Sequence, residues 1–303
     1  MFLSAWLVCG CSDSKQHNEP ITGIDPSCEG HSAVEYAPAW SPDGEFVAYN
    51  HITTCGTYYV EGVDGIYVIR ADGTDRRLLV PFGWDPDWSP DGSQIAYSYG
   101  AATCTYHLET DSVGVIFSSL GLHWPDWSPD GNKIALARVT CCPWGVCVSN
   151  RITRIKTWLG PGLEPDWSPD GSELVCCYAG VCIVSSDGSS RRQVTSNNPR
   201  TPTTLSPHWR PDGSSIIFER EWKVWIVDTD GSNLRSLGDG RSPAWSPDGE
   251  LIVFAWHSEI GADTVSQRIW LMNADGTNRH QLTFPDTTKT LTPVGQPPIF
   301  IKY

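Results

Sequence analysis

A series of polar side chains stands just before six regularly spaced tryptophans, and these side chains are the best candidates for chemistry in the chain. They comprise five carboxylates, one imidazole and one guanidinium: Asp85, Asp87, Asp126, Glu164, Asp166, His208 and Arg241. Clustered carboxylates can hold a hard cation or a basic peptide. The sequence therefore predicts a ligand-binding or partner-binding site here. The alternative is a solvated acidic rim or a set of local hydrogen bonds.

The tryptophans belong to a seven-residue phrase that recurs along the chain. Pro-Asp-Trp-Ser-Pro-Asp-Gly covers 86–92, 125–131 and 165–171, and close variants cover 38–44, 207–213 and 243–249. The tryptophans of the phrase are Trp40, Trp88, Trp127, Trp167, Trp209 and Trp245. Their spacing of about 40 residues is that of one four-stranded propeller blade.

Each copy of the phrase predicts a strand, a tight turn and a second strand. Pro presets φ at the second turn position and Gly relieves the last, and β-rich runs such as 46–49 and 216–218 follow. Third strands are predicted at 66–69, 181–184, 224–227 and 269–272. The predicted fold is all-β, a six-bladed β-propeller of four-stranded antiparallel blades, with the tryptophans buried between blades.

The innermost strand of each propeller blade starts near one mouth of the central channel. We therefore expect the five carboxylates to gather at one side of that mouth, with His208 and Arg241 opposite. Replacing Asp87, Asp126 and Asp166 together by Ala tests this hypothesis, because binding of a cation or a partner should then be lost.

The repeated phrase, together with an Asp-Gly-[Ser/Thr]-x-x-Arg-x-Leu phrase after the third strands, resembles the TolB-type propeller repeat. The resemblance covers residues 37–284 and implies a six-bladed propeller without the N-terminal α/β domain of the TolB family. It also implies an envelope protein whose propeller docks another protein. One of the flanking segments, 12–36 or 285–303, is expected to supply a strand that closes the ring.

The first 11 residues resemble a lipoprotein-type or secretory signal. An apolar run at 2–8 is followed by Gly10 and Cys11, and Cys11 is the candidate for lipidation. The run is too short to span a bilayer. We expect an exported protein, periplasmic or anchored at the outer membrane, that contacts a membrane only through such an anchor.

Cysteine spacing also fits an oxidising compartment. Cys142 and Cys147 flank one predicted two-residue hairpin turn, and Cys177 and Cys182 flank another. Across such a turn the two Cα atoms come within about 4.5 Å, which allows a disulfide. A metal site built from the two Cys-Cys-x4-Cys runs is the alternative.

Net charge and missing motifs narrow the function classes. The formal charge of −14 opposes binding to nucleic acid and to anionic membranes. The sequence has no Gly-x-Ser-x-Gly elbow, no His-Glu-x-x-His motif and no phosphate loop. We therefore predict a non-catalytic, monomeric, protein-binding propeller without a cofactor. The alternative is a metal-dependent carbohydrate-active enzyme at the channel mouth, since oligogalacturonate lyase-like propellers hold manganese with several histidines.

Overall fold

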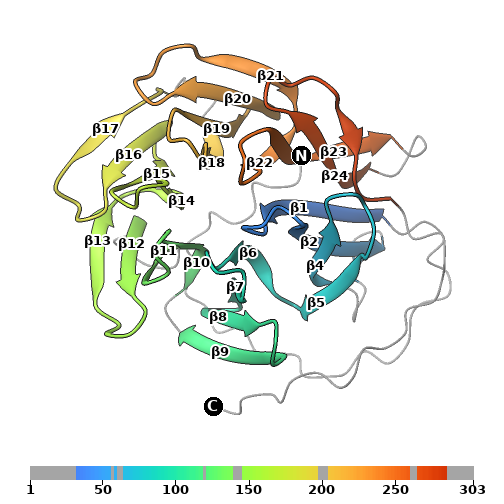
Figure 1. Ribbon diagram of the computed structural model, residues 1–303, viewed down its shortest axis with the longest axis horizontal. Helices are drawn as coiled ribbons and strands as arrows, with labels where there is room; N and C mark the ends of the chain where they lie inside the picture. The colour runs from blue at the N-terminus through green and yellow to red at the C-terminus, as the bar shows by residue number, and fades with distance from the viewer. Residues whose placement is uncertain are drawn as a thin grey trace.

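The protein is all-β in its computed structural model. The structure describes residues 32–55, 58–59, 64–118, 121–138, 145–196, 204–259 and 265–284, and these contain 25 strands and no helix. Successive sets of four strands are arranged around a common centre, like the blades of a propeller (Figure 1). The predicted all-β propeller class is confirmed.

Four of these sets are separate four-stranded antiparallel sheets, called blades 2 to 5 from here on. Blade 2 consists of β6 (Trp84–Trp88), β7 (Gln94–Tyr99), β8 (Ala102–His107) and β9 (Ser112–Phe117). Blade 3 consists of β10 (Leu122–Trp127), β11 (Lys133–Arg138), β12 (Gly145–Asn150) and β13 (Lys156–Gly160). Blade 4 consists of β14 (Leu163–Trp167), β15 (Glu173–Cys177), β16 (Val181–Ser185) and β17 (Arg191–Gln193). Blade 5 consists of β18 (Thr204–Trp209), β19 (Ser215–Arg220), β20 (Lys223–Asp228) and β21 (Arg235–Asp239).

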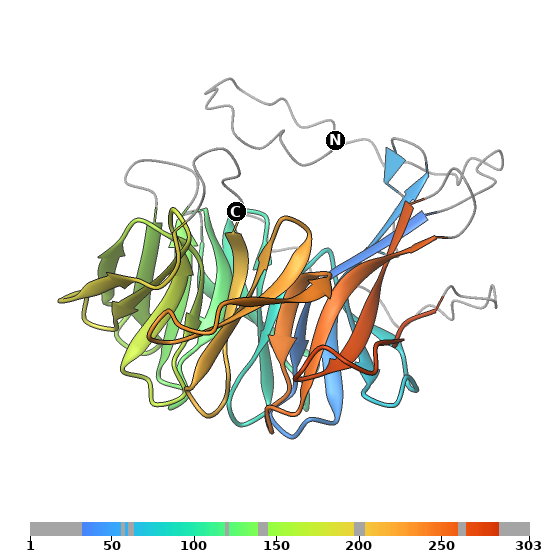
Figure 2. The same ribbon diagram turned by 90° about the horizontal axis from the view of Figure 1, so that it is seen from above.

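The remaining strands form one larger sheet, in which two further sets are joined. Blade 6 consists of β22 (Arg241–Trp245), β23 (Leu251–Glu259), β24 (Val265–Asn273) and β25 (His280–Gln281). Blade 1 consists of β1 (Ser32–Trp40), β2 (Phe46–Cys55), β4 (Gly65–Arg70) and β5 (Arg77–Pro81), with β3 (Tyr58–Tyr59) paired to β2. The two sets meet where Val34 of β1 pairs in parallel with Gln267 of β24. The long strands β1, β2, β23 and β24 rise above the rest of the ring on one face (Figure 2).

The repeated Ser-Pro-Asp-Gly turn is built from short-range hydrogen bonds. In the first copy, the Ser41 hydroxyl donates to Asp43 at 2.5 Å and accepts from the Phe46 N–H at 2.9 Å. The Gly44 N–H donates to the Ser41 carbonyl at 2.9 Å. Gly44 has a φ of 73°, a left-handed conformation that Gly adopts without steric cost. The phrase therefore encodes the reversal between the first and second strands of a blade.

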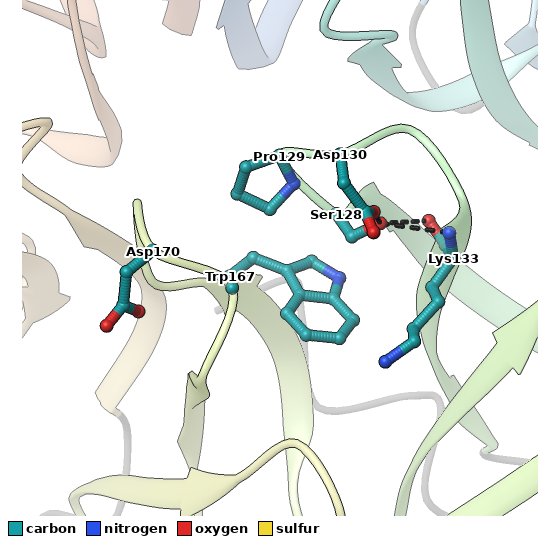
Figure 3. A pocket seen from close by; sticks show the side chains of 7 residues that line it. Ser128, Pro129, Asp130, Lys133, Trp167 and Asp170 are labelled. Carbon is teal, nitrogen blue, oxygen red and sulfur yellow. Dashed lines mark hydrogen bonds between the residues drawn. The ribbon is translucent and has the colours of Figure 1, made fainter.

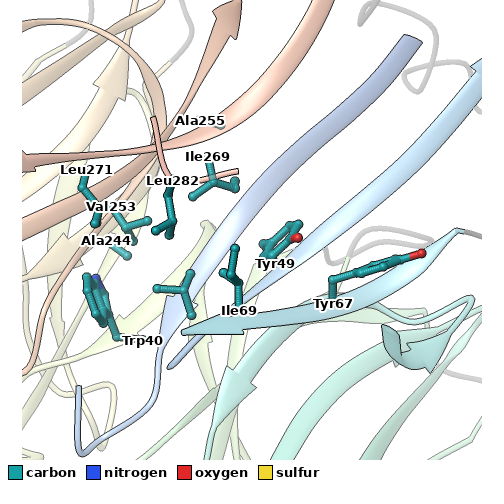
Figure 4. Packing of buried hydrophobic residues seen from close by; sticks show 11 residues of the cluster. Trp40, Tyr49, Tyr67, Ile69, Ala244, Val253, Ala255, Ile269, Leu271 and Leu282 are labelled. Carbon is teal, nitrogen blue, oxygen red and sulfur yellow. The ribbon is translucent and has the colours of Figure 1, made fainter. Parts of the chain in front are cut away.

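The hydrophobic core lies in the seams between blades. Each repeated tryptophan is at most 9% exposed and belongs to a cluster that it shares with strands of the preceding blade. Trp40 completes the series, because its cluster combines Ile69 of blade 1 with Val253 and Leu271 of blade 6 (Figure 4). The ring is closed by a hydrophobic seam of the same kind as the others.

Candidate functional site

The predicted carboxylates lie on the first strands of the blades. Each first strand begins at one face of the ring and ends, at its tryptophan, near the Ser-Pro-Asp-Gly turns on the opposite face (Figure 2). We call these the strand-start face and the turn face. Because the strands of a blade are antiparallel, the turns between second and third strands also lie at the strand-start face.

Three of the predicted aspartates connect one blade to the next. In each case the backbone N–H of a repeated tryptophan donates to Oδ2 of an aspartate in the preceding blade at 2.7 Å: Trp127 to Asp87, Trp167 to Asp126 and Trp209 to Asp166. Blade 5 has His208 at this position, with its Nδ1 3.5 Å from the Trp245 nitrogen. The residue before the tryptophan therefore joins adjacent first strands.

Burial and mutual repulsion raise the pKa values of these carboxyl groups. Burial raises the pKa of Asp87 to about 8, with a further contribution from the Asp166 charge. Burial and the charges of Asp166 and Asp87 raise the pKa of Asp126 well above its usual range. Burial also raises the pKa of Asp166, although His208, with Nε2 3.3 Å from Asp166 Oδ1, acts to lower it. Ionising all three aspartates together is therefore costly unless a cation is near.

A second series lies three residues before each tryptophan, where the first strand is bulged. The register between first and second strands shifts there in every blade. The bulge residues have positive φ values of 45° to 54°: Ala37, Asp85, Trp124, Glu164, Ser206 and Ser242. Residues other than Gly adopt this conformation at a cost and keep it where their surroundings fix it. Bulges of this kind re-aim side chains at the ends of strands.

Side chains of the preceding blade hold several of these bulges. The bulge N–H donates to such a side chain in three cases: Asp85 to Asn50, Ser206 to Glu164 and Ser242 to Glu219. Burial raises the pKa of Asp85 to about 6 and that of Glu164 to about 7. Asn50 and Glu219 were not predicted, because they lie on second strands, outside the repeated phrase. Each pairs with the residue at the edge of a bulge, Asn50 with Tyr36 and Glu219 with Leu205, which is the signal that could have found them.

The other two predicted residues, His208 and Arg241, each contact one carboxylate. His208 contacts Asp166, and Arg241 Nε lies 2.9 Å from Oε1 of Glu219. Within the residues that the structure describes, no group of three or more His, Cys, Asp or Glu side chains is arranged to hold a metal ion. His123 and His257 instead lie beside tryptophan rings.

Aromatic side chains also lie on the strand-start face. Trp84 and Trp124, at the beginnings of β6 and β10, are partly exposed. Trp222, in the turn between β19 and β20, is 52% exposed. Trp256 and His257 of β23 lie beside it in the raised part of blade 6. The strand-start face therefore carries accessible aromatic rings beside the partly buried bulge carboxylates Asp85 and Glu164. Asp87, Asp126 and Asp166 lie next to the tryptophans, at the other end of the first strands.

A buried charged cluster joins blades 6 and 1. The carboxylate of Glu35, in β1, is fully buried and lies 3.1 Å from His51, 3.3 Å from Arg76 and 3.5 Å from Arg268, and it accepts a hydrogen bond from the Thr283 hydroxyl. Burial acts to raise the pKa of Glu35, but the hydrogen bond with His51 and the three nearby cationic side chains outweigh it and lower the pKa. This cluster was not predicted, because its members occur once and belong to no repeat.

A cavity of about 300 Å³ lies between blades 3 and 4 at the turn face (Figure 3). Asp130 and Asp170 line it, and each accepts a hydrogen bond from the serine of its own turn. Lys133 Nζ lies over the Trp167 ring, 5.8 Å from its centroid. The polar groups of the cavity belong to the repeated turns, so we assign no site to it.

The register between β15 and β16 differs by one residue from the prediction. Cys182 lies opposite Cys176, and Cys177 lies opposite Val181. The turn contains three residues, 178–180, instead of two, and this moves every later pair by one position. The predicted pairing of Cys177 with Cys182 was therefore wrong.

Five cysteines are free and buried: Cys104, Cys147, Cys176, Cys177 and Cys182. Cys142, the predicted partner of Cys147, lies outside the described residues, as does Cys11, the lipidation candidate. Both assignments remain predictions.

The fold and its repeated turn define a β-propeller with short four-stranded blades, and sequence comparison identifies the family. The TolB beta propeller domain matches residues 84–292, which is more than half of the chain. The chain therefore belongs to the TolB β-propeller domain family. No curated protein matches the sequence. The described residues contain no helix long and apolar enough to cross a membrane.

Solved structures with the same fold include TolB proteins and lyases. TolB from Acinetobacter baumannii is 20% identical with a TM-score of 0.61, over 82% of this chain and 62% of that one. The putative TolB from Agrobacterium tumefaciens is 19% identical with a TM-score of 0.56, over 79% and 90% of the two chains. An oligogalacturonate lyase in complex with manganese is 14% identical with a TM-score of 0.56, over 86% and 81%. The chain thus spans less than two thirds of the Acinetobacter protein, and these likenesses establish the fold alone.

Proposed function

We propose that this chain is a non-catalytic docking module of the cell envelope, which binds a partner protein through its strand-start face. The observation that carries the proposal is the set of accessible tryptophans on that face, Trp84, Trp124 and Trp222. Tryptophan is among the residues that contribute most binding energy at protein interfaces. The turn face offers mainly the Pro, Asp and Gly residues of the repeated phrase.

Membership of the TolB propeller family supports an envelope role. In this proposal the chain is exported, is anchored through a lipid on Cys11, and acts as a monomer. Its partner is a protein of the same compartment.

The carboxylates have a second role in the proposal. Asp87, Asp126 and Asp166 repel one another when ionised, and the hydrogen bonds to tryptophan N–H groups engage only one oxygen of each. A basic side chain of the partner placed beside them would relieve this repulsion and release protons. Binding of such a group should therefore tighten as pH rises.

A metal-dependent carbohydrate-active enzyme is the second candidate. It is favoured by the likeness in fold to an oligogalacturonate lyase in complex with manganese, over 86% of this chain. Metal analysis of the purified protein separates the two candidates, because the enzyme needs a stoichiometric metal ion and the docking module does not.

Affinity capture with the full chain tests the proposal. The wild-type protein, Trp124→Ala on the strand-start face and Trp158→Ala on the outer strand β13 are immobilised and exposed to an envelope extract, and bound proteins are identified by mass spectrometry. Docking predicts one dominant protein that is retained by Trp158→Ala and depleted on Trp124→Ala. Failure to capture a protein, together with a tightly held manganese ion, would contradict docking and favour the enzyme.

A further inference from the structure

The turn between β19 and β20 holds a tryptophan in a backbone conformation that large side chains disfavour. Arg220 pairs with Lys223, so Glu221 and Trp222 alone form the turn. Both residues have positive φ values, 54° and 64°. Two-residue hairpin turns of this kind favour Asn-Gly, because both positions need a left-handed conformation. A bulky residue there is an outlier that requires an explanation.

Burial does not supply that explanation. The side chain of Trp222 leaves more than half of its surface in solvent, with 52% of the residue exposed. One face of its ring lies on the guanidinium of Arg241, whose Cζ is 4.3 Å from the ring centroid. Arg241 is itself held by Glu219, and the Trp222 carbonyl accepts a hydrogen bond from the Gly240 N–H at 2.9 Å. One face of the indole therefore rests on Arg241, and about half of the residue, 52%, stays exposed.

Aromatic rings of blade 6 extend this surface. The His257 ring lies 6.3 Å from that of Trp222, and Trp256 lies 5.5 Å from His257. Burial and the nearby charge of Arg241 lower the pKa of His257, which keeps the imidazole neutral. Because Arg241 is paired with Glu219, the centre of the surface carries no net charge.

We propose that Trp222 anchors an arginine-bearing segment of the partner protein, which stacks its guanidinium on the open face of the indole. The proposal rests on the docking function above and names the chemistry that the partner brings. The face of an indole attracts a guanidinium, and Arg241 already occupies the other face in this manner. An arginine on each side would enclose the ring between two cations.

The overall charge of the chain points to the same occupant. Glu221, next to Trp222, is exposed and forms no ion pair within the part of the chain that the structure describes. Lys223 lies opposite Asp239 across the β20–β21 ladder, so these two charges offset each other. The chain as a whole has a formal charge of −14, which attracts a basic partner.

The disfavoured turn follows from this role. An anchor that is already fixed in its binding position loses little conformational freedom when the partner arrives. Backbone strain of this kind is retained where function requires the side chain at that position. Removing the strain should therefore stabilise the hairpin and remove the anchor at the same time.

The variant E221N/W222G separates these two effects, because it installs the favoured Asn-Gly turn. We expect its melting temperature to equal or exceed that of the wild type. Trp222→Ala is a second variant that leaves Glu221 in place, and Trp158→Ala is the matched control, since Trp158 is 39% exposed on the outer strand β13.

The binding probe is a random dodecapeptide phage library selected on the immobilised full chain. Peptides that depend on Trp222 should be enriched in arginine, bind Trp158→Ala as they bind wild type, and lose at least tenfold in affinity on E221N/W222G and on Trp222→Ala. Replacing the selected arginine by Ala in a synthetic peptide should cause a similar loss.

Three results would overturn the inference. They are Trp222-dependent peptides without arginine, binders that are unaffected by both Trp222 variants, and the absence of any binder. In the second case, loss of those binders on Trp124→Ala would leave the docking function standing without the Trp222 anchor. In the third case, a failed capture from envelope extract would remove the docking function as well.

Discussion

The turn face and the strand-start face are built from the same repeats, but their residues differ in how much they vary from blade to blade. On the turn face, five of the repeated turns pack against the turn of the preceding blade. A Cβ atom added to the glycine of each would lie within 4.0 Å of a proline of that preceding turn: Gly44, Gly92, Gly131, Gly171 and Gly249. On the strand-start face, the six bulge positions carry Ala, Asp, Trp, Glu, Ser and Ser. A constant set of residues reflects a structural requirement. Varied side chains on a constant backbone are where binding can be specified.

The largest expected effect contrasts two tryptophans. Trp127 is 5% exposed in the seam between blades 2 and 3, so Trp127→Ala should cost about 3–5 kcal/mol of unfolding free energy through lost packing and the cavity left behind. Trp222→Ala should cost less than about 1 kcal/mol, because that side chain is exposed and loses mainly its contact with Arg241, while Ala keeps the positive φ. Denaturant unfolding of both variants measures the difference. Equal losses would contradict the contrast between the faces.

The charged cluster between blades 6 and 1 gives the next effect. Glu35→Ala leaves His51, Arg76 and Arg268 together without their carboxylate, and removing one partner of a buried ion pair costs about 3–5 kcal/mol. Glu45→Ala is the matched control, because its pair with Arg70 is exposed and should contribute less than about 1 kcal/mol. Chemical denaturation of the two variants should separate them clearly. A small loss in Glu35→Ala would mean that the hydrophobic seam alone closes the ring.

The pH dependence of stability should have opposite signs for a first-strand aspartate and for an aspartate of the repeated turn. The pKa of Asp87 is raised to about 8 in the folded protein, so its carboxyl group contributes fully to folding stability below the unfolded pKa of about 4. That stability is lost as pH rises through the folded pKa. Hydrogen bonds from Ser89 and Ser93 lower the pKa of Asp91, on the turn face, to about 2. The stability that Asp91 contributes is therefore lost only as pH falls below about 4. We expect a higher melting temperature at pH 5 than at pH 8. Asp87→Asn, which keeps an oxygen for the Trp127 N–H, should reduce that difference in calorimetry, and an unchanged slope would contradict the assignment.

The smallest effect tests the interlocked turns. Gly92 has a φ of 70° and a Cβ there would meet Pro42 at 3.4 Å, whereas Gly213 has a φ of 74° and no atom within 4 Å of that position. Both substitutions to Ala carry a conformational cost of about 1 kcal/mol. Gly92→Ala should lower the melting temperature further than Gly213→Ala, because only at Gly92 does the added Cβ crowd a proline of the preceding turn. Indistinguishable values would show that the proline contacts add nothing.

The turn face could be predicted from the sequence because its contacts are local. Ser41, Asp43 and Gly44 satisfy one another within a few residues, so the repeated phrase is sufficient to specify the turn. The β15–β16 register was missed for an equally local reason, since a turn of three residues rather than two moved every pair by one position.

The contacts of the first strands could be predicted only in part. The spacing placed the aspartates on first strands, but their hydrogen bonds cross blade boundaries and depend on how neighbouring blades are oriented. Glu219 and Asn50 act across the same boundaries from second strands. Glu35 meets Arg268 across 233 residues, and no periodicity relates the two. Such contacts follow from the closed ring rather than from any one repeat.

Site-specific photocrosslinking tests the central claim most directly. A photoreactive amino acid replaces Lys223, which is exposed beside Trp222, or Pro129, which is exposed on the turn face, and cells producing each form of the full chain are irradiated. A docking module that uses its strand-start face predicts a discrete crosslinked protein from position 223 and none from position 129. Crosslinks from position 129 alone, or equal yields from both positions, would contradict that account.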